Sequence, residues 1–305
     1  MRAWLLGGAI AVVAATAVTA QQGRFKGRID LVNVPVMVLD RQGNFISNLS
    51  ATDFEVYENG QKQDLSVFVR GDAEREALKL RLGLLFDTSG SMFEDMGLAC
   101  TAAIRFLKDL PEAEDITLVD FDTEVRVAQY GTSELPRLVE RIRSRKADGW
   151  TSLYDALGIY LDGAHDLEGR KILVIYTDGG DTRSAQTFAD VIAMLKSSDV
   201  IVYTVGSLEH QDLRSKTEQK LRLQQLADVT GGEAFFPQGL EDVTPTLERI
   251  ARDIRSSYTI GYAPPADGKS AARRIKVEVH PSDGRRLAVR ARSAYIKDSA
   301  EDRRD

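Results

Sequence analysis

This 305-residue sequence contains a single cysteine and has no excess of basic residues. The single cysteine excludes an intrachain disulfide, so burial of a hydrophobic core must stabilise the fold. Lys and Arg number 40 against 46 Asp and Glu, and the net charge of -6 provides no general attraction for a polyanion. We therefore expect no nucleic-acid partner. Cys100, in MGLACTAAIRFL, is predicted to be a small core residue on the apolar face of a helix.

The sequence also lacks a hydrophobic run long enough to span a bilayer. The apolar stretch from Leu5 to Val18 is shorter than the roughly 20 residues that a membrane helix needs. Arg2 precedes this stretch, and the small residues of Val18-Thr19-Ala20 at its end form a cleavage site. The pattern is typical of an export signal at residues 1–20 that is cleaved after Ala20. A membrane anchor is the alternative. We expect a secreted or periplasmic protein with no stable membrane anchor after signal cleavage, because no cysteine directly follows the apolar stretch to carry a lipid and the charged tail KDSAEDRRD cannot be an anchor.

Residues 24–72 show the alternating pattern of β-strands. The stretch FEVYENGQKQDLSVFV contains Asn59-Gly60, a pair suited to a tight hairpin turn. Pro35 has no N–H to donate, so its strand is predicted to be an edge strand or to carry a bulge there.

Residues 79–257 alternate between apolar strands and amphipathic helices. Strands are predicted at LKLRLGLLFD, DITLVDFD, EVRVAQY, RKILVIYTDG and DVIVYTVG, with helices between and after them, the first from Ser91 to Leu110. This alternation predicts an α/β fold: a doubly wound, mostly parallel, Rossmann-like sheet with helices on both faces.

Residues 258–297 return to strand patterns, and residues 298–305 form a charged tail. One isolated hairpin is only marginally stable. We therefore expect the N-terminal and C-terminal β segments to pack together as a small β-sandwich, with the α/β region inserted between them.

Oxygen-bearing side chains gather where the predicted sheet ends. Asp87 and Asp178 each follow a strand, and the other candidates are the hydroxyls of Ser89, Ser91 and Thr151. Two carboxylates and three hydroxyls suit Mg²⁺, or Mn²⁺, rather than zinc. No histidine is next to these loops in the sequence. The alternative is purely structural: Ser91 and Glu94 would form a capping box, and residues 87–90 a metal-free turn.

The motif DTSGSM resembles the D-x-S-x-S signature of the von Willebrand factor type A domain, known as the VWA domain. The resemblance covers residues 79–257, and the whole layout resembles bacterial secreted proteins described as VWFA-related acidobacterial-type domain proteins. It implies a metal-ion-dependent adhesion site, in which Ser89, Ser91 and Thr151 bind the ion directly. Asp87 and Asp178 would act largely through bound waters, and a partner protein would supply an Asp or Glu to the metal.

Three residues near these loops have more than one interpretation. Trp150 stands where the family often has a small residue, so its ring is either a contact at the rim or packed against a helix. Asp155 and Asp181 are interpreted as loop caps or hydrogen-bond acceptors rather than ligands.

Three classes of function remain to be compared. The favoured interpretation is a non-enzymatic, adhesion-type protein-binding module. An aspartate-dependent phosphoryl-transfer enzyme would use Asp87 as nucleophile, but Ser89 occupies the place of the second acid in the D-x-D motif of such enzymes. A structural envelope domain with a non-functional metal site is the third class. The sequence indicates neither the partner nor the oligomeric state.

Overall fold

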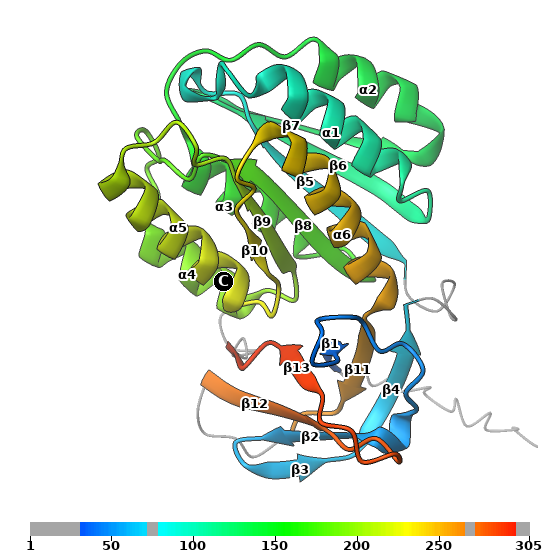
Figure 1. The fold of residues 1–305 in the computed structure, drawn as a ribbon. Helices are drawn as coiled ribbons and strands as arrows, with labels where there is room; N and C mark the ends of the chain where they lie inside the picture. The colour runs from blue at the N-terminus through cyan, green and yellow to red at the C-terminus, as the bar shows by residue number, and fades with distance from the viewer. Residues whose placement is uncertain (1–30, 72–78, 266–271, 297–305) are drawn as a thin grey trace, which may run out of the picture. The chain divides into compact units, whose positions relative to one another are not determined.

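The computed structural model describes residues 31–71, 79–265 and 272–296 (Figure 1). The predicted export signal and the charged tail lie outside these ranges. None of the helices in the described ranges is both long and apolar enough to cross a membrane.

A six-stranded sheet forms the centre of the α/β region. Its strands are β5 (Leu80–Asp87), β6 (Ala113–Phe121), β7 (Val125–Gly131), β8 (Arg170–Thr177), β9 (Ile201–Gly206) and β10 (Ala234–Phe235). Their order is β10-β9-β8-β5-β6-β7, and every pairing is parallel except that of β7 with β6. This confirms the predicted mostly parallel sheet and puts the carboxyl ends of β5 and β8 side by side at one edge.

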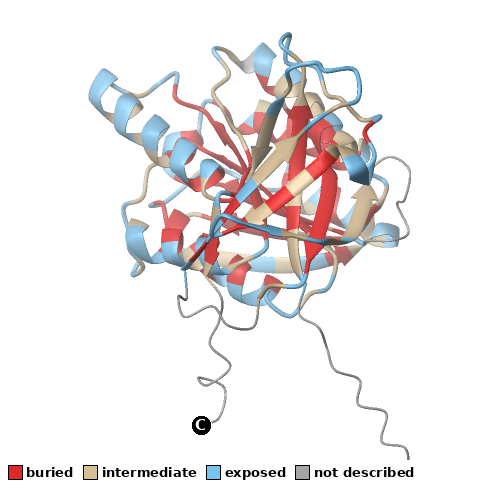
Figure 2. Cartoon of the chain, turned by 90° about the horizontal axis from the view of Figure 1, so that it is seen from below, coloured by how far each residue is buried: buried red, intermediate tan, exposed pale blue. Residues whose placement is uncertain are grey.

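Helices of the described ranges cover both faces of this sheet (Figure 1). They are α1 (Met96–Lys108), α2 (Leu135–Arg143), α3 (Leu153–Ala164), α4 (Phe188–Ser197), α5 (Leu213–Asp228) and α6 (Val243–Ser256). The same region contains the short 3₁₀ turns η2 (Gly90–Met92), η3 (Thr132–Glu134) and η4 (Leu240–Asp242), and a further one, η1 (Ala51–Asp53), precedes β2. Successive β5 side chains point to opposite faces: Leu84 and Phe86 pack with α1, α2 and α6, whereas Leu85 packs with α3, α4 and α5. Figure 2 shows the buried strands between helices whose outer faces are exposed.

The remaining strands form two antiparallel sheets. They are β1 (Val32–Leu39), β2 (Phe54–Glu58), β3 (Gln61–Gln63), β4 (Leu65–Arg70), β11 (Tyr258–Tyr262), β12 (Ala272–Val279), β13 (Ala288–Ala291) and β14 (Ala294–Ile296). The strand orders are β13-β1-β11-β4 and β14-β12-β2-β3, so each sheet contains strands from both ends of the described chain. Their inner faces share one hydrophobic cluster that includes Val36, Val56 and Tyr258. The predicted sandwich of N-terminal and C-terminal segments is confirmed.

The chain leaves and re-enters this sandwich at neighbouring positions. Arg70 at the end of β4 pairs with Tyr258 at the start of β11, and the whole α/β region lies between them in the sequence. Closely spaced ends allow such an insertion without distortion of the host sheet. The domain limits 24–72, 79–257 and 258–297 themselves stay a prediction.

Two local predictions in the sandwich have different outcomes. Asn59 and Gly60 both adopt positive φ, 50° and 87°, and join β2 to β3 in the expected tight hairpin. The prediction of an edge strand at Pro35 is wrong, because β1 lies between β11 and β13. Proline fits there because the pairing with β13 begins only at Val36, so the strand is locally open on that side.

Candidate metal centre

Asp87 lies at the carboxyl end of β5 and is completely buried. Its Oδ1 accepts a hydrogen bond from the backbone N–H of Ser89 at 2.9 Å, and its Oδ2 accepts one from the Thr177 hydroxyl at 2.5 Å. Burial, and next the negative charge of Asp178, raise the pKa of Asp87 to about 7. The structure therefore brings the two predicted carboxylates within electrostatic reach of each other.

The two serines lie on the turn that follows Asp87. Ser89 is buried and Ser91 is exposed, and their hydroxyl oxygens are 3.2 Å apart. The prediction that a helix begins at Ser91 is wrong: η2 covers Gly90–Met92, and α1 begins only at Met96. The alternative interpretation, a capping box of Ser91 and Glu94, is also wrong, since Ser91 does not cap α1 and its hydroxyl faces Ser89 instead.

Thr151 lies in the loop before α3, and backbone hydrogen bonds join this loop to its neighbours. Gly90 N–H donates to the Gly149 carbonyl at 3.0 Å, and Thr182 N–H donates to the Thr151 carbonyl at 2.9 Å. Thr151 is 5% exposed, and none of the hydrogen bonds within the described residues involves its hydroxyl. Because no other group of the described residues bonds to it, this oxygen is available to a ligand.

Asp178 follows β8 and is held from two sides. Its Oδ1 accepts from the N–H of Gly180 at 3.0 Å, and its Oδ2 accepts from the Gln211 side-chain amide at 2.8 Å. No Lys or Arg in the described ranges forms an ion pair with Asp178 or Asp87. The loops that carry all five predicted residues are thus joined by hydrogen bonds at one edge of the sheet; we call Asp87, Ser89, Ser91, Thr151 and Asp178 the candidate site.

The other residues discussed from the sequence have clear positions. Asp181 accepts from Tyr154 N–H at 2.9 Å, and Asp155 accepts from Ala185 N–H at 3.0 Å, which confirms both as loop-holding acceptors. The Trp150 side chain is 62% exposed, so the interpretation as a ring packed against a helix is wrong. Cys100 is buried in the core as predicted.

Sequence reasoning missed several residues around the candidate site. Thr177 and Gln211 hold the two carboxylates; the available signals were that Thr177 ends β8 and that Gln211 lies in the loop after β9. His210, which seemed remote in the sequence, lies 3.4 Å from Oδ1 of buried Asp95 and 3.1 Å from Glu94. The Ser207 hydroxyl donates to the other Asp95 oxygen. Long-range folding alone brings this loop beside the start of α1.

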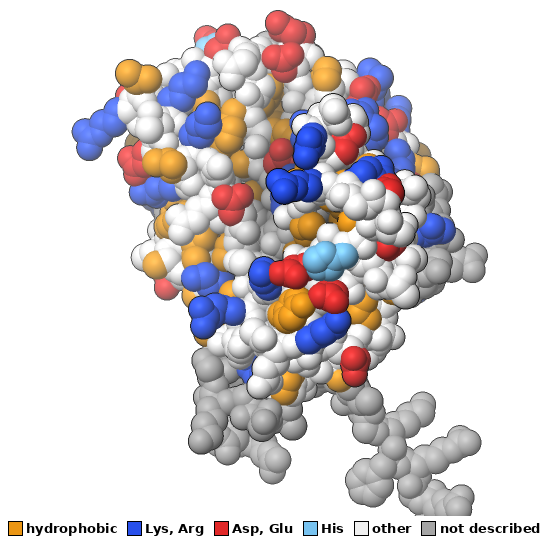
Figure 3. Space-filling view, turned by 60° about the horizontal axis from the view of Figure 1, so that its bottom comes forward, with side chains coloured by type: hydrophobic (Ala, Val, Ile, Leu, Met, Phe, Trp, Pro, Cys, Tyr) orange, Lys and Arg blue, Asp and Glu red, His pale blue; other side chains and the backbone are white. Residues whose placement is uncertain are grey.

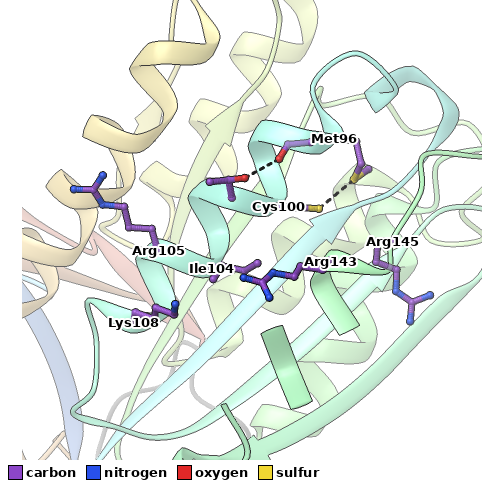
Figure 4. A pocket seen from close by; sticks show the side chains of 9 residues that line it. Met96, Cys100, Ile104, Arg105, Lys108, Arg143 and Arg145 are labelled. Atoms are coloured by element: carbon purple, nitrogen blue, oxygen red, sulfur yellow. Dashed lines mark hydrogen bonds between the residues drawn. The ribbon is translucent and has the colours of Figure 1, made fainter. Parts of the chain in front are cut away.

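Two further polar features lie elsewhere. A groove of 480 Å³ next to α1 has the apolar residues Met96, Cys100 and Ile104 together with Arg105, Lys108, Arg143 and Arg145 along its walls, and it includes no candidate-site residue (Figure 4). Figure 3 shows the underside of the view in Figure 1, where charges of both signs surround a histidine.

Glu55, Glu278 and His280 form the one group of three His, Cys, Asp or Glu side chains in the described residues whose ligand atoms lie within 4.8 Å of one another. Lys62 and Lys276 already pair with these glutamates, each at 2.5 Å. These part-exposed glutamates thus have compensating cations, unlike Asp87 and Asp178.

Comparison with known proteins adds a family and a fold. The profile of the von Willebrand factor type A domain matches residues 82–251. No curated protein matches the sequence.

Solved structures that resemble the chain share little sequence identity with it. The pilus adhesin SpaC of Lactobacillus rhamnosus GG, in an open conformation, has a TM-score of 0.51 at 11% identity, covering 84% of this chain and 49% of that one. A D319A mutant of the PilB minor pilin of Streptococcus sanguinis has a TM-score of 0.47 at 16% identity, covering 59% and 62%. A von Willebrand factor type A protein of Catenulispora acidiphila has a TM-score of 0.47 at 12% identity, covering 91% and 76%. The chain thus spans less than two thirds of SpaC and of PilB, and identities this low show the fold alone.

Proposed function

Because the chain belongs to the von Willebrand factor type A family, we propose that it is a non-enzymatic, adhesion-type binding module whose candidate site holds Mg²⁺, or Mn²⁺, and docks an acidic side chain of a partner protein. The same proposal makes it an exported protein, secreted or periplasmic, as the pattern of residues 1–20 predicts.

The observation that carries the proposal is the pair of buried carboxylates without a cation of their own. Burial of a charge is costly unless an opposite charge compensates it. Buried Glu58, for example, pairs with buried Arg273. Asp87 and Asp178 have hydrogen bonds but no Lys or Arg partner in the described ranges. A divalent cation would supply the missing positive charge.

The oxygen set fits a hard cation. Two carboxylates together with the hydroxyls of Ser89, Ser91 and Thr151 are the ligand types that Mg²⁺ and Mn²⁺ accept. When bound, the ion would attract the carboxylate of a partner. Thr177 and Gln211 act as positioning residues, because each donates a hydrogen bond to one of the two carboxylates and fixes its orientation.

The geometry gives little support to catalysis. Ser89 stands where an aspartyl-phosphate enzyme has the second acid of its D-x-D motif, so the motif lacks its general acid. Ser207 and His210 do not form a nucleophile–base pair either: the serine hydroxyl donates to Asp95, and His210 contacts the opposite oxygen of that same carboxylate. A structural domain with an unused metal site is the alternative that the experiment below distinguishes.

Metal-dependent thermal stability tests the proposal. Mg²⁺ at about 100 times its Kd should raise the unfolding free energy by about 2.7 kcal/mol and the Tm by roughly 5–10 °C relative to EDTA. Asp178→Asn should abolish this rise, because it removes one of the two negative charges that the bound cation would compensate.

Asp181→Asn is the matched control, since Asp181 holds the same loop through hydrogen bonds but lies outside the candidate site. It should retain the full Mg²⁺-dependent rise even if its own Tm is lower. An equal rise in wild type and Asp178→Asn, or none in wild type, would contradict the assignment.

A further inference from the structure

Of the four most exposed large apolar side chains of the described residues, three belong to segments next to the candidate site and the fourth, Leu221, lies further along α5. Leu213 is 82% exposed, Phe93 75%, Leu221 63% and Trp150 62%, and the next most exposed is 47%. Single exposed apolar residues are ordinary, but a concentration of them marks an interaction surface. We call these four residues the apolar rim.

Three members of the apolar rim are attached to the loops of the candidate site. Phe93 is two residues beyond Ser91, and Trp150 directly precedes Thr151. These two loops are joined by the hydrogen bond from Gly90 to Gly149. Leu213 is two residues beyond Gln211, whose amide donates to Asp178. The apolar side chains therefore stand next to the oxygen ligands rather than at random positions on the surface.

Helix α5 extends the apolar rim away from the site. Leu213, Thr217 and Leu221 are spaced by four residues and share one helix face, about 12 Å long. A hollow of 770 Å³ on this face is lined by Asp212, Leu213, Arg214, Thr217, Glu218 and Leu221.

The α5 leucines of the apolar rim are not needed for the core. The opposite face of α5 packs through Leu223, Leu226 and Ala227, which are completely buried. Leu213 and Leu221 contribute no comparable burial within the chain. An external partner that covers them would gain hydrophobic free energy that a water-exposed metal–carboxylate contact alone does not provide.

The backbone around the apolar rim is held in place before any partner arrives. Trp150 N–H donates to the Thr123 hydroxyl at 2.9 Å, and the Asp212 side chain caps α5 by accepting from the N–H of Arg214 at 3.0 Å and of Ser215 at 3.2 Å. A surface whose backbone is already ordered loses less entropy on binding.

We propose that the apolar rim binds an amphipathic segment of the partner protein, in which the acidic residue that reaches the candidate site is accompanied by aliphatic or aromatic side chains that cover Phe93, Trp150, Leu213 and Leu221. This inference rests on the proposed function for the role of the acidic residue. It adds the chemical class of the partner and assigns the source of affinity to the apolar rim.

Position next to the candidate site favours a protein segment over a membrane surface. The hollow on α5 is lined by Arg214 as well as by Asp212 and Glu218, so charges of both signs lie beside the two leucines. A protein segment carries apolar side chains and a single carboxylate in one chain, which matches a polar site bordered by apolar residues.

The test uses a phage library of random 12-residue peptides, selected on the immobilised full chain in Mg²⁺ and eluted at low pH. The most enriched sequence is then made as a synthetic peptide, and its Kd is measured by fluorescence anisotropy. We expect enriched peptides to contain Asp or Glu with Leu, Ile, Phe, Trp or Tyr nearby.

The double variant Leu213→Ser/Leu221→Ser should weaken binding of this peptide at least about 30-fold. Its Mg²⁺-dependent Tm rise should equal that of wild type, which also shows that the variant is folded. Ile159→Ser is the matched control, because Ile159 is an exposed aliphatic residue on α3 outside the apolar rim, and it should leave the Kd unchanged.

Failure of this inference and failure of the proposed function give different results. Acidic peptides with polar flanks, or a Kd unaffected by the leucine changes, overturn the inference and leave the metal-dependent function intact. Peptides that bind equally in EDTA overturn the proposed function.

The other possible occupants of the apolar rim have their own signatures. Co-flotation of the chain with phosphatidylcholine/phosphatidylglycerol vesicles, lost in the double variant, would replace the proposal with a membrane surface. A dimer in sedimentation equilibrium that the same variant dissociates would replace it with a second copy of this chain.

Discussion

Buried carboxylates in this molecule are compensated in two different ways. Glu58 on β2 is 2% exposed and accepts hydrogen bonds from the phenols of Tyr262 at 2.8 Å and Tyr295 at 2.9 Å, besides its pair with Arg273. Asp87 accepts hydrogen bonds from the Ser89 backbone N–H and from Thr177, and it forms no ion pair with a Lys or Arg among the described residues. The Glu58 carboxylate therefore has a cation within the fold, whereas the Asp87 carboxylate has none there.

The Glu58 network should therefore be a strong determinant of stability. Glu58→Gln removes the carboxylate that pairs with the Arg273 guanidinium, itself 2% exposed, and should lower the unfolding free energy by about 3–5 kcal/mol. Urea denaturation measures this change.

Glu55 lies on the same strand as Glu58 and is the matched control. It is part-exposed and pairs with exposed Lys62, so Glu55→Gln should cost less than about 1 kcal/mol. Similar losses for the two substitutions would show that the buried pair is not specially important.

At the level of elements, close contact between β5 and α3 sets the packing of one face of the central sheet. Gly83 faces the ring of Tyr160 on α3, and a Cβ atom at this position would lie 2.3 Å from the ring. Both residues are buried. Because Gly83 has no side chain, β5, the strand that ends in Asp87, can pack closely against α3.

Gly83→Ala should lower the unfolding free energy by about 1–3 kcal/mol, because Tyr160 has to shift within a packed core. The double variant with Tyr160→Leu should lose less than the sum of the two single changes, which denaturation of all three proteins would show.

Gly97→Ala on α1 is the contrasting substitution, since nothing lies within 4 Å of the added Cβ and the residue is exposed. It should stabilise the protein by about 0.5–1 kcal/mol. A destabilised Gly97→Ala, or a neutral Gly83→Ala, would contradict this account of the packing.

At the level of the whole molecule, one charged cluster connects the last helix of the α/β region to the sandwich. Asp253 on α6 is completely buried and lies 3.4 Å from Arg290 on β13, which also pairs with Glu233. Burial raises the pKa of Asp253 to about 7 despite the nearby guanidinium.

This shift predicts a definite pH dependence of stability. The pKa of Asp253 is higher in the folded state than the unfolded value of 3.8, so the folded state binds the proton more tightly. The contribution of Asp253 to the unfolding free energy is complete below about pH 4 and is lost as the pH rises through 7. Asp253→Asn keeps the neutral form, so its stability relative to wild type should increase by up to about 2 kcal/mol between pH 5 and pH 8. Parallel stability–pH curves from urea denaturation would contradict the prediction.

The sequence by itself determined the features that depend on local order along the chain. The β/α alternation of residues 79–257 gave the parallel sheet, and Asn59-Gly60 gave the hairpin, because periodicity and turn chemistry act over a few residues. The strand ends also placed Asp87 and Asp178 at one sheet edge. One local prediction was wrong: residues 90–92 form the 3₁₀ turn η2, although the helical periodicity predicted an α-helix from Ser91.

Only the tertiary structure decided the features that depend on contacts between distant segments. Strand order put β1 inside its sheet despite Pro35, and folding brought Thr177 to Asp87 and Gln211 to Asp178. The exposure of Trp150 follows from how its loop is tied to Thr123. Each of these contacts joins residues that are far apart in the sequence, and such pairings leave no local periodicity from which they could be predicted.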